Sequence, residues 1–206
     1  GVYNESVVVE TDNIVIRGVD RQTVVLDGEH SEEMANGIIV FSNGVAVENL
    51  TVKNYFSNGV FFTGDYDSDF ILRGYRVSYV NALNNRVYGI YAFNAEYGLF
   101  DNTYAAGHTD SGYYIGQCQP CNAVLSNNLS EYNTLAYSGT NAGGDLFIVN
   151  NEFRMNRIGV TPNTLNSEEL APQRGATFAG NWLHSNGNPD TPKGGDVWAV
   201  SDTHLT

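Results

Sequence analysis

Basic residues are scarce in this chain of 206 residues. Ten Lys and Arg stand against 23 Asp and Glu, which gives a net charge of −13. Proteins that bind nucleic acid present a basic face or stripe to the phosphate backbone. We therefore expect no nucleic-acid partner and no strong unaided binding of a polyanion.

The chain also lacks a long apolar run and has only two Cys. Without 18 or more consecutive apolar residues we expect no membrane insertion. Gly1–Val9 does not have the charged and then apolar pattern of a signal peptide. It has the pattern expected in the middle of a first coil, which indicates a trimmed or mature segment. Two Cys are too few for a disulfide framework. Little Lys with much Asn, Gly, Tyr and Thr favours an exported protein, either secreted, periplasmic or at the cell surface.

One short pattern recurs along the chain: Gly followed by about four β-branched or aromatic residues, as in Gly89–Phe93. The Gly slot falls at positions 37, 59, 89, 112, 136 (here Ala) and 159, so the spacings are 22, 30, 23, 24 and 23. Repeats of this length indicate a solenoid, and apolar runs bounded by Gly, Asn and Ser are typical of buried strands. Leu is too scarce for a leucine-rich repeat, and a propeller blade needs about 40–45 residues. The sequence predicts an all-β fold, a single-stranded parallel β-helix of about 7–8 coils, right-handed by the rule for parallel crossovers.

We expect one domain over residues 1–206. It divides into an N-terminal coil and cap (1–35), central coils (36–184) and a C-terminal cover (185–206) with a last short strand at Val197–Val200. Two insertions, Gly64–Asp69 and Thr161–Arg174, are predicted to emerge as loops on one face, which in solenoids is often the binding face.

A second landmark is an Asn that precedes a short strand-like run. Asn tolerates a left-handed backbone and bonds to nearby main-chain groups, so it suits the corner of a coil. Stacked coils would place equivalent amides above one another as a ladder. The landmark positions are Asn49, Asn102, Asn128, Asn151 and Asn181.

The opening segments GVYNESVVV, NIVIRGVD and VVLDG, followed by the NGI-type strands, resemble the right-handed parallel β-helix superfamily of pectate lyases, polysaccharide epimerases and periplasmic copper-maturation repeat proteins. The resemblance covers nearly the whole chain and implies the fold. Catalytic motifs do not carry over. The chain has neither the Asp-Pro-His of alginate epimerases nor an acidic set followed by Arg that matches the pectate lyases.

Alternation along the strands predicts an aromatic stripe. If the residue after each Gly slot points inward, the next one points outward, because successive side chains of a strand face opposite ways. Phe61, Tyr91 and Tyr114 then form a stripe on one sheet, flanked by Phe41 and Phe93. Exposed aromatic ladders mark binding sites, and flat rings with polar rims suit sugar faces. A register slip of one residue would instead turn these rings inward, and covering loops would hide them.

A candidate catalytic set lies beside this stripe. His108 and Asp110 precede a predicted strand, and one coil away in either direction the spacing leads to Arg86 and Tyr132. These side chains would supply a base, a carboxylate neutraliser and a general acid, as polysaccharide lyases and epimerases require. The competing interpretation is a hydrogen-bonded corner of the coil.

Two smaller motifs complete the candidates. Cys118 and Cys121 are predicted to form a local disulfide or to remain free thiols. A redox motif would need a thioredoxin-type strand and helix, which are absent, and a zinc site would need two further ligands. Copper binding by the two Cys with a His is supported only by the resemblance. Asp65, Asp67 and Asp69 alternate in an inserted loop and could bind Ca²⁺, although the Gly and closing Glu of an EF-hand are missing. The usual role of such a loop is a solvated surface.

Together these features predict an exported protein that binds a polysaccharide along the aromatic stripe and that could act on it as a lyase or epimerase. The alternative is a non-catalytic β-helix for display, adhesion or metal delivery. The two are distinguished by whether His108, Asp110 and Arg86 come into contact.

Overall fold

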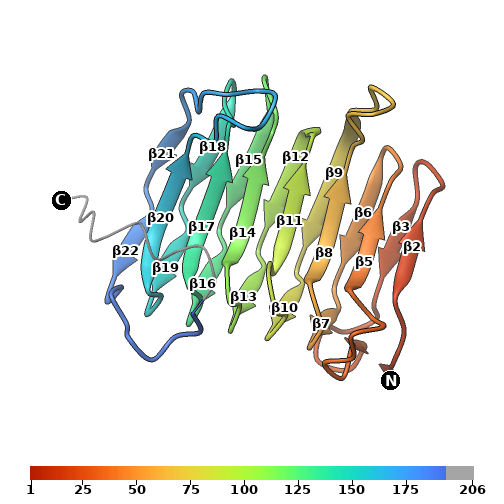
Figure 1. Ribbon diagram of the computed structural model, residues 1–206. Coiled ribbons are helices and arrows are strands. Elements are labelled where there is room, and N and C mark those ends of the chain that lie inside the picture. The colour runs from red at the N-terminus through yellow and green to blue at the C-terminus, as the bar shows by residue number, and fades with distance from the viewer. Residues whose placement is uncertain (194–206) are drawn as a thin grey trace.

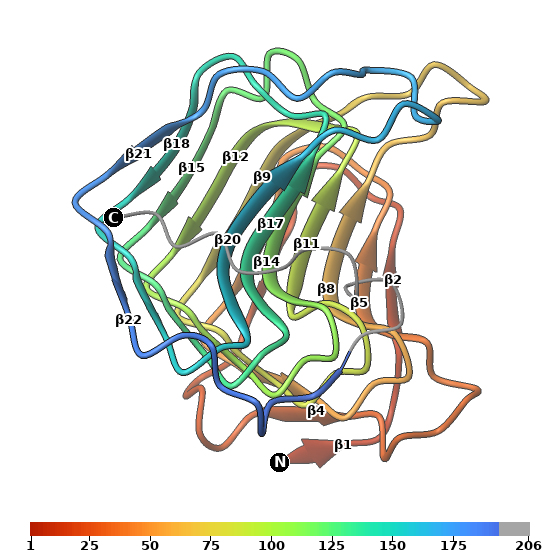
Figure 2. The same ribbon diagram turned by 60° about the vertical axis from the view of Figure 1, so that its left-hand side comes forward.

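The computed structural model describes residues 1–193 and consists of three parallel sheets, which form the three sides of a solenoid (Figures 1 and 2). The all-β parallel β-helix with about 7–8 coils is confirmed. The predicted strand Val197–Val200, and the end of the C-terminal cover with it, lie outside the described residues. Within residues 1–193 there is no helix long and apolar enough to cross a membrane.

Each coil contributes one strand to each sheet. Sheet A contains β1 (Val2–Tyr3), β4 (Val25–Asp27), β7 (Thr51–Lys53), β10 (Asn81–Leu83), β13 (Tyr104–Ala106), β16 (Leu129–Glu131), β19 (Glu152–Arg154) and β22 (Trp182–His184). Sheet B contains β2 (Val7–Val9), β5 (Asn36–Val40), β8 (Asn58–Thr63), β11 (Ile90–Phe93), β14 (Ser111–Gly116), β17 (Leu135–Thr140) and β20 (Ile158–Asn163). Sheet C contains β3 (Val15–Arg17), β6 (Val45–Glu48), β9 (Leu72–Ser78), β12 (Ala95–Asp101), β15 (Ala123–Ser126), β18 (Leu146–Val149) and β21 (Thr177–Ala179).

The Gly pattern of the sequence belongs to sheet B, and its predicted register is correct. The residues after the first five Gly slots are buried, and they pair between neighbouring coils as Ile38 with Val60, Val60 with Ile90, and Ile90 with Tyr113. A side chain at the slot itself has little room. A Cβ at Gly59 or Gly89 would lie 2.5 Å from a carbonyl oxygen of the next coil. The recurring Gly therefore reflects the close approach of stacked coils.

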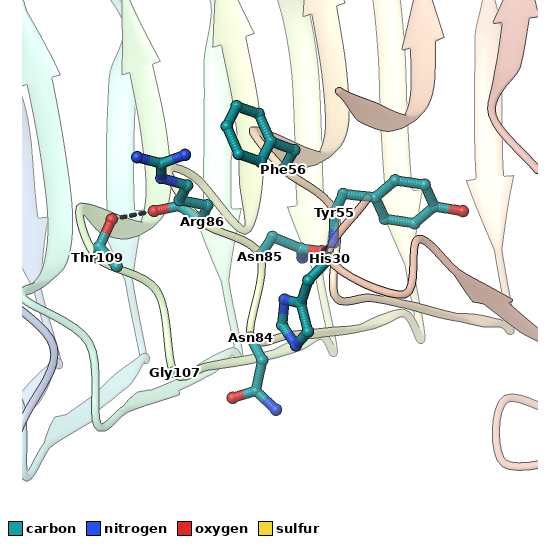
Figure 3. Close-up of a pocket in the computed structure, with 8 residues that line it drawn as sticks. All are labelled: His30, Tyr55, Phe56, Asn84, Asn85, Arg86, Gly107 and Thr109. Atoms are coloured by element: carbon teal, nitrogen blue, oxygen red, sulfur yellow. Dashed lines mark hydrogen bonds between the residues drawn. The ribbon is translucent and has the colours of Figure 1, made fainter. Parts of the chain in front are cut away.

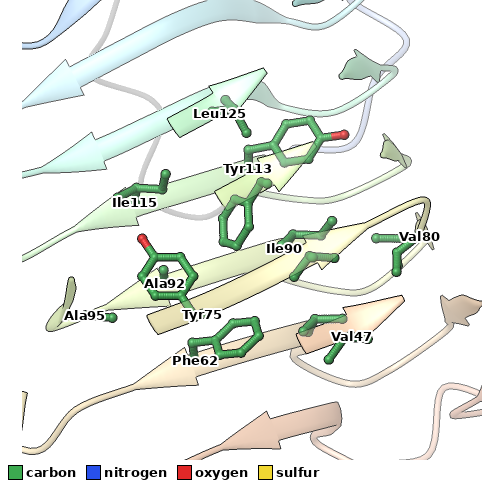
Figure 4. Close-up of a cluster of buried hydrophobic side chains, with 14 of the residues drawn as sticks. Val47, Phe62, Tyr75, Val80, Ile90, Ala92, Ala95, Tyr113, Ile115 and Leu125 are labelled. Atoms are coloured by element: carbon green, nitrogen blue, oxygen red, sulfur yellow. The ribbon is translucent and has the colours of Figure 1, made fainter. Parts of the chain in front are cut away.

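The core fills the space between the three sheets (Figure 4). Phe62 from sheet B and Tyr75 and Phe100 from sheet C meet there, with ring centroids 5.3–6.5 Å apart. Small and β-branched residues such as Val47, Val52 and Ala82 are also fully buried and allow the sheets to come together. In the central coils one side of each strand faces this core, so apolar burial continues from coil to coil and supplies the main stabilisation.

The corner between sheets C and A is held by an amide ladder. Asn128 donates its main-chain N–H to Asn151 Oδ1, and Asn151 donates in the same way to Asn181 Oδ1, each at 3.0 Å. Their side-chain NH₂ groups donate to carbonyl oxygens of sheet C. The predicted ladder is thus present at Asn128, Asn151 and Asn181. Asn49 and Asn102 lie one position earlier, where the backbone is left-handed with φ of 55° at both.

Both insertions leave the same edge of sheet B, after β8 and after β20 (Figure 2). They meet on Gln117, which lies between them after β14. Tyr66 of the first insertion donates its hydroxyl to Gln117 Oε1 at 2.9 Å, and the main-chain N–H of Leu170 in the second donates to the same atom at 3.4 Å. Gln117 Nε2 in turn donates to Glu168. The loops therefore form one connected wall along this edge.

The ladder predicts the first stability experiment. Asn151→Ala removes the acceptor of Asn128 N–H and the donor to Leu125 O in a buried corner, and an unsatisfied buried polar group costs about 1–3 kcal/mol. We expect unfolding in urea to show a loss of at least that size. The matched control is Asn150→Gly, one residue earlier, where the side chain is exposed and glycine accepts the left-handed backbone. Equal losses in the two variants would contradict the ladder's role.

Candidate functional site

The outer face of sheet B carries the predicted aromatic stripe. Phe61 pairs with Tyr91, and Tyr91 pairs with Tyr114, in three successive strands. The Phe61 and Tyr91 rings are stacked, with centroids 4.3 Å apart and planes 3° apart, and Tyr114 meets Tyr91 edge-on at 4.8 Å. Phe61 and Tyr91 are half-buried, whereas Tyr114 is only 5% exposed. The rings thus face outward, and Phe61 and Tyr91 offer the accessible part.

Neighbouring rings extend and fix this stripe. Phe93 meets Tyr91 at 6.0 Å and is approached edge-on by Tyr66 of the first insertion at 5.8 Å. Tyr88 lies 4.5 Å from Tyr91 and 5.2 Å from Tyr114. Strand alternation does not identify Tyr88, because it lies three residues before Tyr91, in the turn that precedes β11. Phe41 is 42% exposed and shows no ring contact with the stripe.

Burial shapes the chemistry of these tyrosines. It raises the pKa of Tyr91 well above its ordinary value, and the nearby Tyr114 and Tyr88 and the charges of Glu168 and Asp110 add to this. Burial likewise raises the pKa of Tyr114. Both hydroxyls therefore remain protonated at neutral pH and act as hydrogen-bonding groups, not as bases.

Arg86 lies in a cavity of about 480 Å³ at the corner between sheets A and B, close to the start of β11 (Figure 3). Its guanidinium carbon lies 4.3 Å from the centroid of the Phe56 ring, a cation–π contact. Thr109 donates its hydroxyl to Arg86 O, which ties the main chain of two coils together. In the described part of the chain, no carboxylate pairs with the Arg86 guanidinium, whereas Arg17, Arg73, Arg76 and Arg154 each pair with an acidic side chain.

His108 is fully buried and belongs to a second amide ladder at this corner. It donates its main-chain N–H to Asn133 Oδ1 at 2.9 Å, as Asn133 does to Asn156 Oδ1 at 3.0 Å. Its ring nitrogens face two main-chain carbonyls, Nδ1 at 3.0 Å from Asn85 O and Nε2 at 3.1 Å from Ala82 O. His108 therefore occupies the place of a ladder Asn, which is the hydrogen-bonded corner that competed with the catalytic interpretation.

The other members of the predicted catalytic set lie apart from the His108 ring. The residue that stacks on His108 is Asn133, one position after the Tyr132 that the spacing predicts. Tyr132 has a left-handed backbone with φ of 56°, and its side chain is 46% exposed. Asp110 accepts a hydrogen bond from Ser111 Oγ at 2.6 Å on the sheet B side. The His108 ring is thus hydrogen-bonded to main-chain oxygens and not to Asp110, Arg86 or Tyr132.

Cys118 and Cys121 form a disulfide, with an S–S distance of 2.12 Å, so the structural interpretation of this pair is confirmed over free thiols. The bridge closes the loop that follows β14, directly after Gln117. Gly143 N–H donates to Cys121 Sγ at 3.3 Å and fastens this loop to the next coil. The bridge therefore stabilises the wall that borders the aromatic stripe.

The acidic loop uses its carboxylates locally. Asp65 Oδ1 accepts the Asp67 N–H at 3.0 Å, Asp65 Oδ2 accepts the Ser68 hydroxyl at 2.7 Å, and the main chains of Asp65 and Phe70 pair across the turn. Among residues 1–193, no three His, Cys, Asp or Glu side chains are arranged to hold a metal ion. Ca²⁺ binding by Asp65, Asp67 and Asp69 stays a prediction.

Comparisons with known proteins yield no relative for this chain. No family model matches it, and neither a curated protein nor a solved structure matches it significantly. The resemblance to the pectate lyase-like superfamily is therefore supported only at the level of the parallel β-helix topology.

The environment of His108 predicts a pH effect on stability. Burial lowers the pKa of His108 to about 4, although the two main-chain carbonyls beside the ring favour its protonated form. In the unfolded chain the same group titrates near 6.5. The folded state then binds fewer protons than the unfolded state. This part of the stability is complete above pH 6.5 and is lost as pH falls from 6.5 towards 4, by roughly 3 kcal/mol.

His108→Asn would restore the ladder residue and remove this titration. We expect the variant to keep most of its stability at pH 7 and to lose less than the parent between pH 7 and pH 4.5, measured by urea unfolding at both values. Carboxylates titrate in the same pH range in the parent and in the variant. The test is therefore the difference between the two proteins in the stability that each loses from pH 7 to pH 4.5. His108→Leu should be destabilised by about 1–3 kcal/mol at pH 7, because it removes the single N–H of the neutral ring and leaves either Asn85 O or Ala82 O without a donor. Identical pH profiles for the parent and His108→Asn would contradict the assignment.

Proposed function

We propose that this protein binds a polysaccharide along the outer face of sheet B. The observation that carries the proposal is the ordered stack of Phe61, Tyr91 and Tyr114 on successive coils. Soluble proteins rarely present an aligned series of rings on a sheet unless the rings contact a ligand. Because adjacent coils are about 4.8 Å apart, the rings repeat along the solenoid axis, which suits an extended chain of repeating sugars.

The rigidity of the stripe favours binding. Each ring is anchored on a paired strand, and Tyr88, Phe93 and Tyr66 restrict the movement of Tyr91 and its neighbours. Side chains that become ordered on binding lose conformational entropy, which reduces affinity. Aromatic side chains that are already fixed in place lose little entropy when a ligand binds. The connected wall of the two insertions borders one edge of the stripe, and the Arg86 cavity lies at the opposite ends of the same strands.

Arg86 gives the site a preference for acidic sugars. Its guanidinium is oriented by Phe56 and is not neutralised by a carboxylate of the described residues, so a ligand carboxylate can take that place. This matters in a protein with a net charge of −13, which would otherwise repel an anionic polymer. A uronate chain that stacks on Phe61 and Tyr91 would extend its charged groups towards this corner.

Binding without turnover is the form of the proposal that these residues support. A general base has to reach the proton that it removes, and the His108 ring is enclosed and engaged with two carbonyls. The lyase or epimerase reaction therefore has no base at His108. Export to an oxidising compartment is part of the proposal and is supported by the Cys118–Cys121 disulfide, since such bridges persist mainly outside the reducing cytosol.

Tyr91→Ala tests the stripe directly. The substitution removes the ring at the centre of the stack, and we expect at least a tenfold loss of affinity, about 1.4 kcal/mol, for the polysaccharides that the parent binds on a glycan array. Tyr91→Phe keeps the ring and should retain most of the binding. Tyr3→Ala removes a tyrosine that is 46% exposed in β1, away from the stripe, and should change nothing. If the parent bound no glycan on the array, the proposal would fail and the scaffold role would stand. Unsaturated sugar ends in the same assay would identify a lyase.

Arg86→Gln tests the preference for acidic sugars. We expect a several-fold weaker affinity for uronate polymers and a smaller dependence of that affinity on NaCl, because one ion pair with the ligand is lost. Affinity for neutral polymers should be unchanged. Titration calorimetry at two salt concentrations measures both effects, and an equal loss for neutral and acidic polymers would assign Arg86 a structural role instead.

A further inference from the structure

The outer face of sheet A has a groove that the sheet B stripe does not use. It has a volume of about 580 Å³ and follows the solenoid axis along the corner where sheets C and A meet. Its floor follows one outward column of sheet A, in which Asn81 pairs with Tyr104, Tyr104 with Leu129, and Leu129 with Glu152. The groove thus crosses four successive coils.

One side of the groove is a row of amides. Asn102, Asn127 and Asn150 occupy equivalent positions of successive coils, with left-handed φ values of 55°, 58° and 55°, so their side chains leave the main chain in the same direction. Asn127 and Asn150 are exposed, and within the described residues their side-chain amides make no hydrogen bond. An amide offers both donors and an acceptor, which is the combination that pairs with a hydroxyl group.

Aromatic side chains mark both ends of the same face. Tyr79 is 53% exposed and lines the groove at the corner position one coil before Asn102. At the other end the floor column continues from Glu152 to Trp182, which is 62% exposed. The Trp182 ring is stacked on His184 at 4.0 Å between centroids, and His184 Nε2 lies 3.2 Å from Glu152 Oε1, so this exposed ring is held in place.

The Glu152 carboxylate, which lines the groove, already has charged partners. Glu152 Oε1 accepts a hydrogen bond from Arg154 at 2.8 Å and faces His184, and Arg21 lies against the main-chain oxygen of Asn102 at 3.5 Å. Hydrogen bonds and charges from His184 and Arg154 lower the pKa of Glu152, so this carboxylate is ionised and neutralised in place. The groove thus offers no free carboxylate to a cationic ligand, and its row of exposed amides favours ligand hydroxyl groups.

We propose that this groove is a second binding site and that it takes an extended, uncharged polysaccharide. Hydroxyl groups of the chain bond to the amides of Asn127 and Asn150, while sugar faces contact Tyr104 and Trp182. The repeat of amides at the coil spacing, about 4.8 Å, matches a ligand that presents hydroxyls at regular intervals and not a compact small molecule. The site is independent of the sheet B stripe, because it lies on a different face of the solenoid.

The test uses the double variant Asn127→Gly/Asn150→Gly. Glycine removes both amides and keeps the left-handed backbone, and Gly180 already occupies the equivalent corner position in the last coil. Hexasaccharides of glucose, mannose and xylose are titrated by NMR into the parent, the double variant and Tyr91→Ala. We expect at least one of them to bind the parent and Tyr91→Ala equally, and to bind the double variant at least tenfold more weakly. Trp182→Ala should weaken the same ligand several-fold.

Met155→Gly is the matched control, because Met155 has the same left-handed backbone at the opposite end of the sheet A strands, with φ of 54°. Its affinity should equal that of the parent, and urea unfolding verifies that all variants are folded. The proposal is overturned if no neutral hexasaccharide binds Tyr91→Ala, or if the double variant retains full affinity. Tyr91→Ala tests binding by the stripe, and the double variant tests binding by the groove. If only the stripe proposal is wrong, the double variant still loses affinity, and if only the groove proposal is wrong, it does not.

Discussion

The vertical stacking of one coil on the next is the constraint on which the rest of this structure depends. In the second half of the chain, two of the three corners of each coil are closed by buried polar side chains, which satisfy the main chain of the coil beside them. Asn128, Asn151 and Asn181 do this at one corner, and Asn133 and Asn156 do so at the other. A buried main-chain group without a partner is costly, so the ladders fix the register of the strands that they connect. That register in turn decides which side chains face the core and which face solvent.

Much of the fold was predictable because the stacking of coils requires particular residues, chiefly Gly and Asn, at regular intervals in the sequence. The Gly slots mark where coils come closest, and the residues after them alternate inward and outward, so Phe61, Tyr91 and Tyr114 could be placed on one outer face. The catalytic set was not predictable in the same way. Spacing alone located His108 within its coil, but His108 fills an Asn position of the ladder, and its ring lies inside the corner. A residue count off by one was enough to exchange Asn133 for Tyr132.

What could not be predicted depends on contacts between segments far apart in the chain. Tyr88 joins the aromatic stripe from a turn, where strand alternation gives no information. The row of exposed amides on sheet A arises because Asn127 and Asn150 have left-handed backbones that turn their side chains outward, whereas the next residues, Asn128 and Asn151, turn inward. Adjacent asparagines in the sequence thus have opposite roles, one in the ladder and the other on the surface. A single three-sided solenoid in this way presents a row of aromatic rings on one face and a row of amides on another.

The meeting of the two insertions on Gln117 has a consequence for how the molecule unfolds. In a solenoid each repeat contacts only its neighbours, so repeats can detach one after another from an end. Here Tyr66 reaches Gln117 from two coils before it, and Leu170 and Glu168 reach it from two coils after it. These contacts couple repeats that do not touch through their sheets. Unfolding that begins at the C-terminal coil cannot reach the central coils without breaking the contacts of Gln117 with both insertions. The central coils should therefore unfold as one cooperative unit.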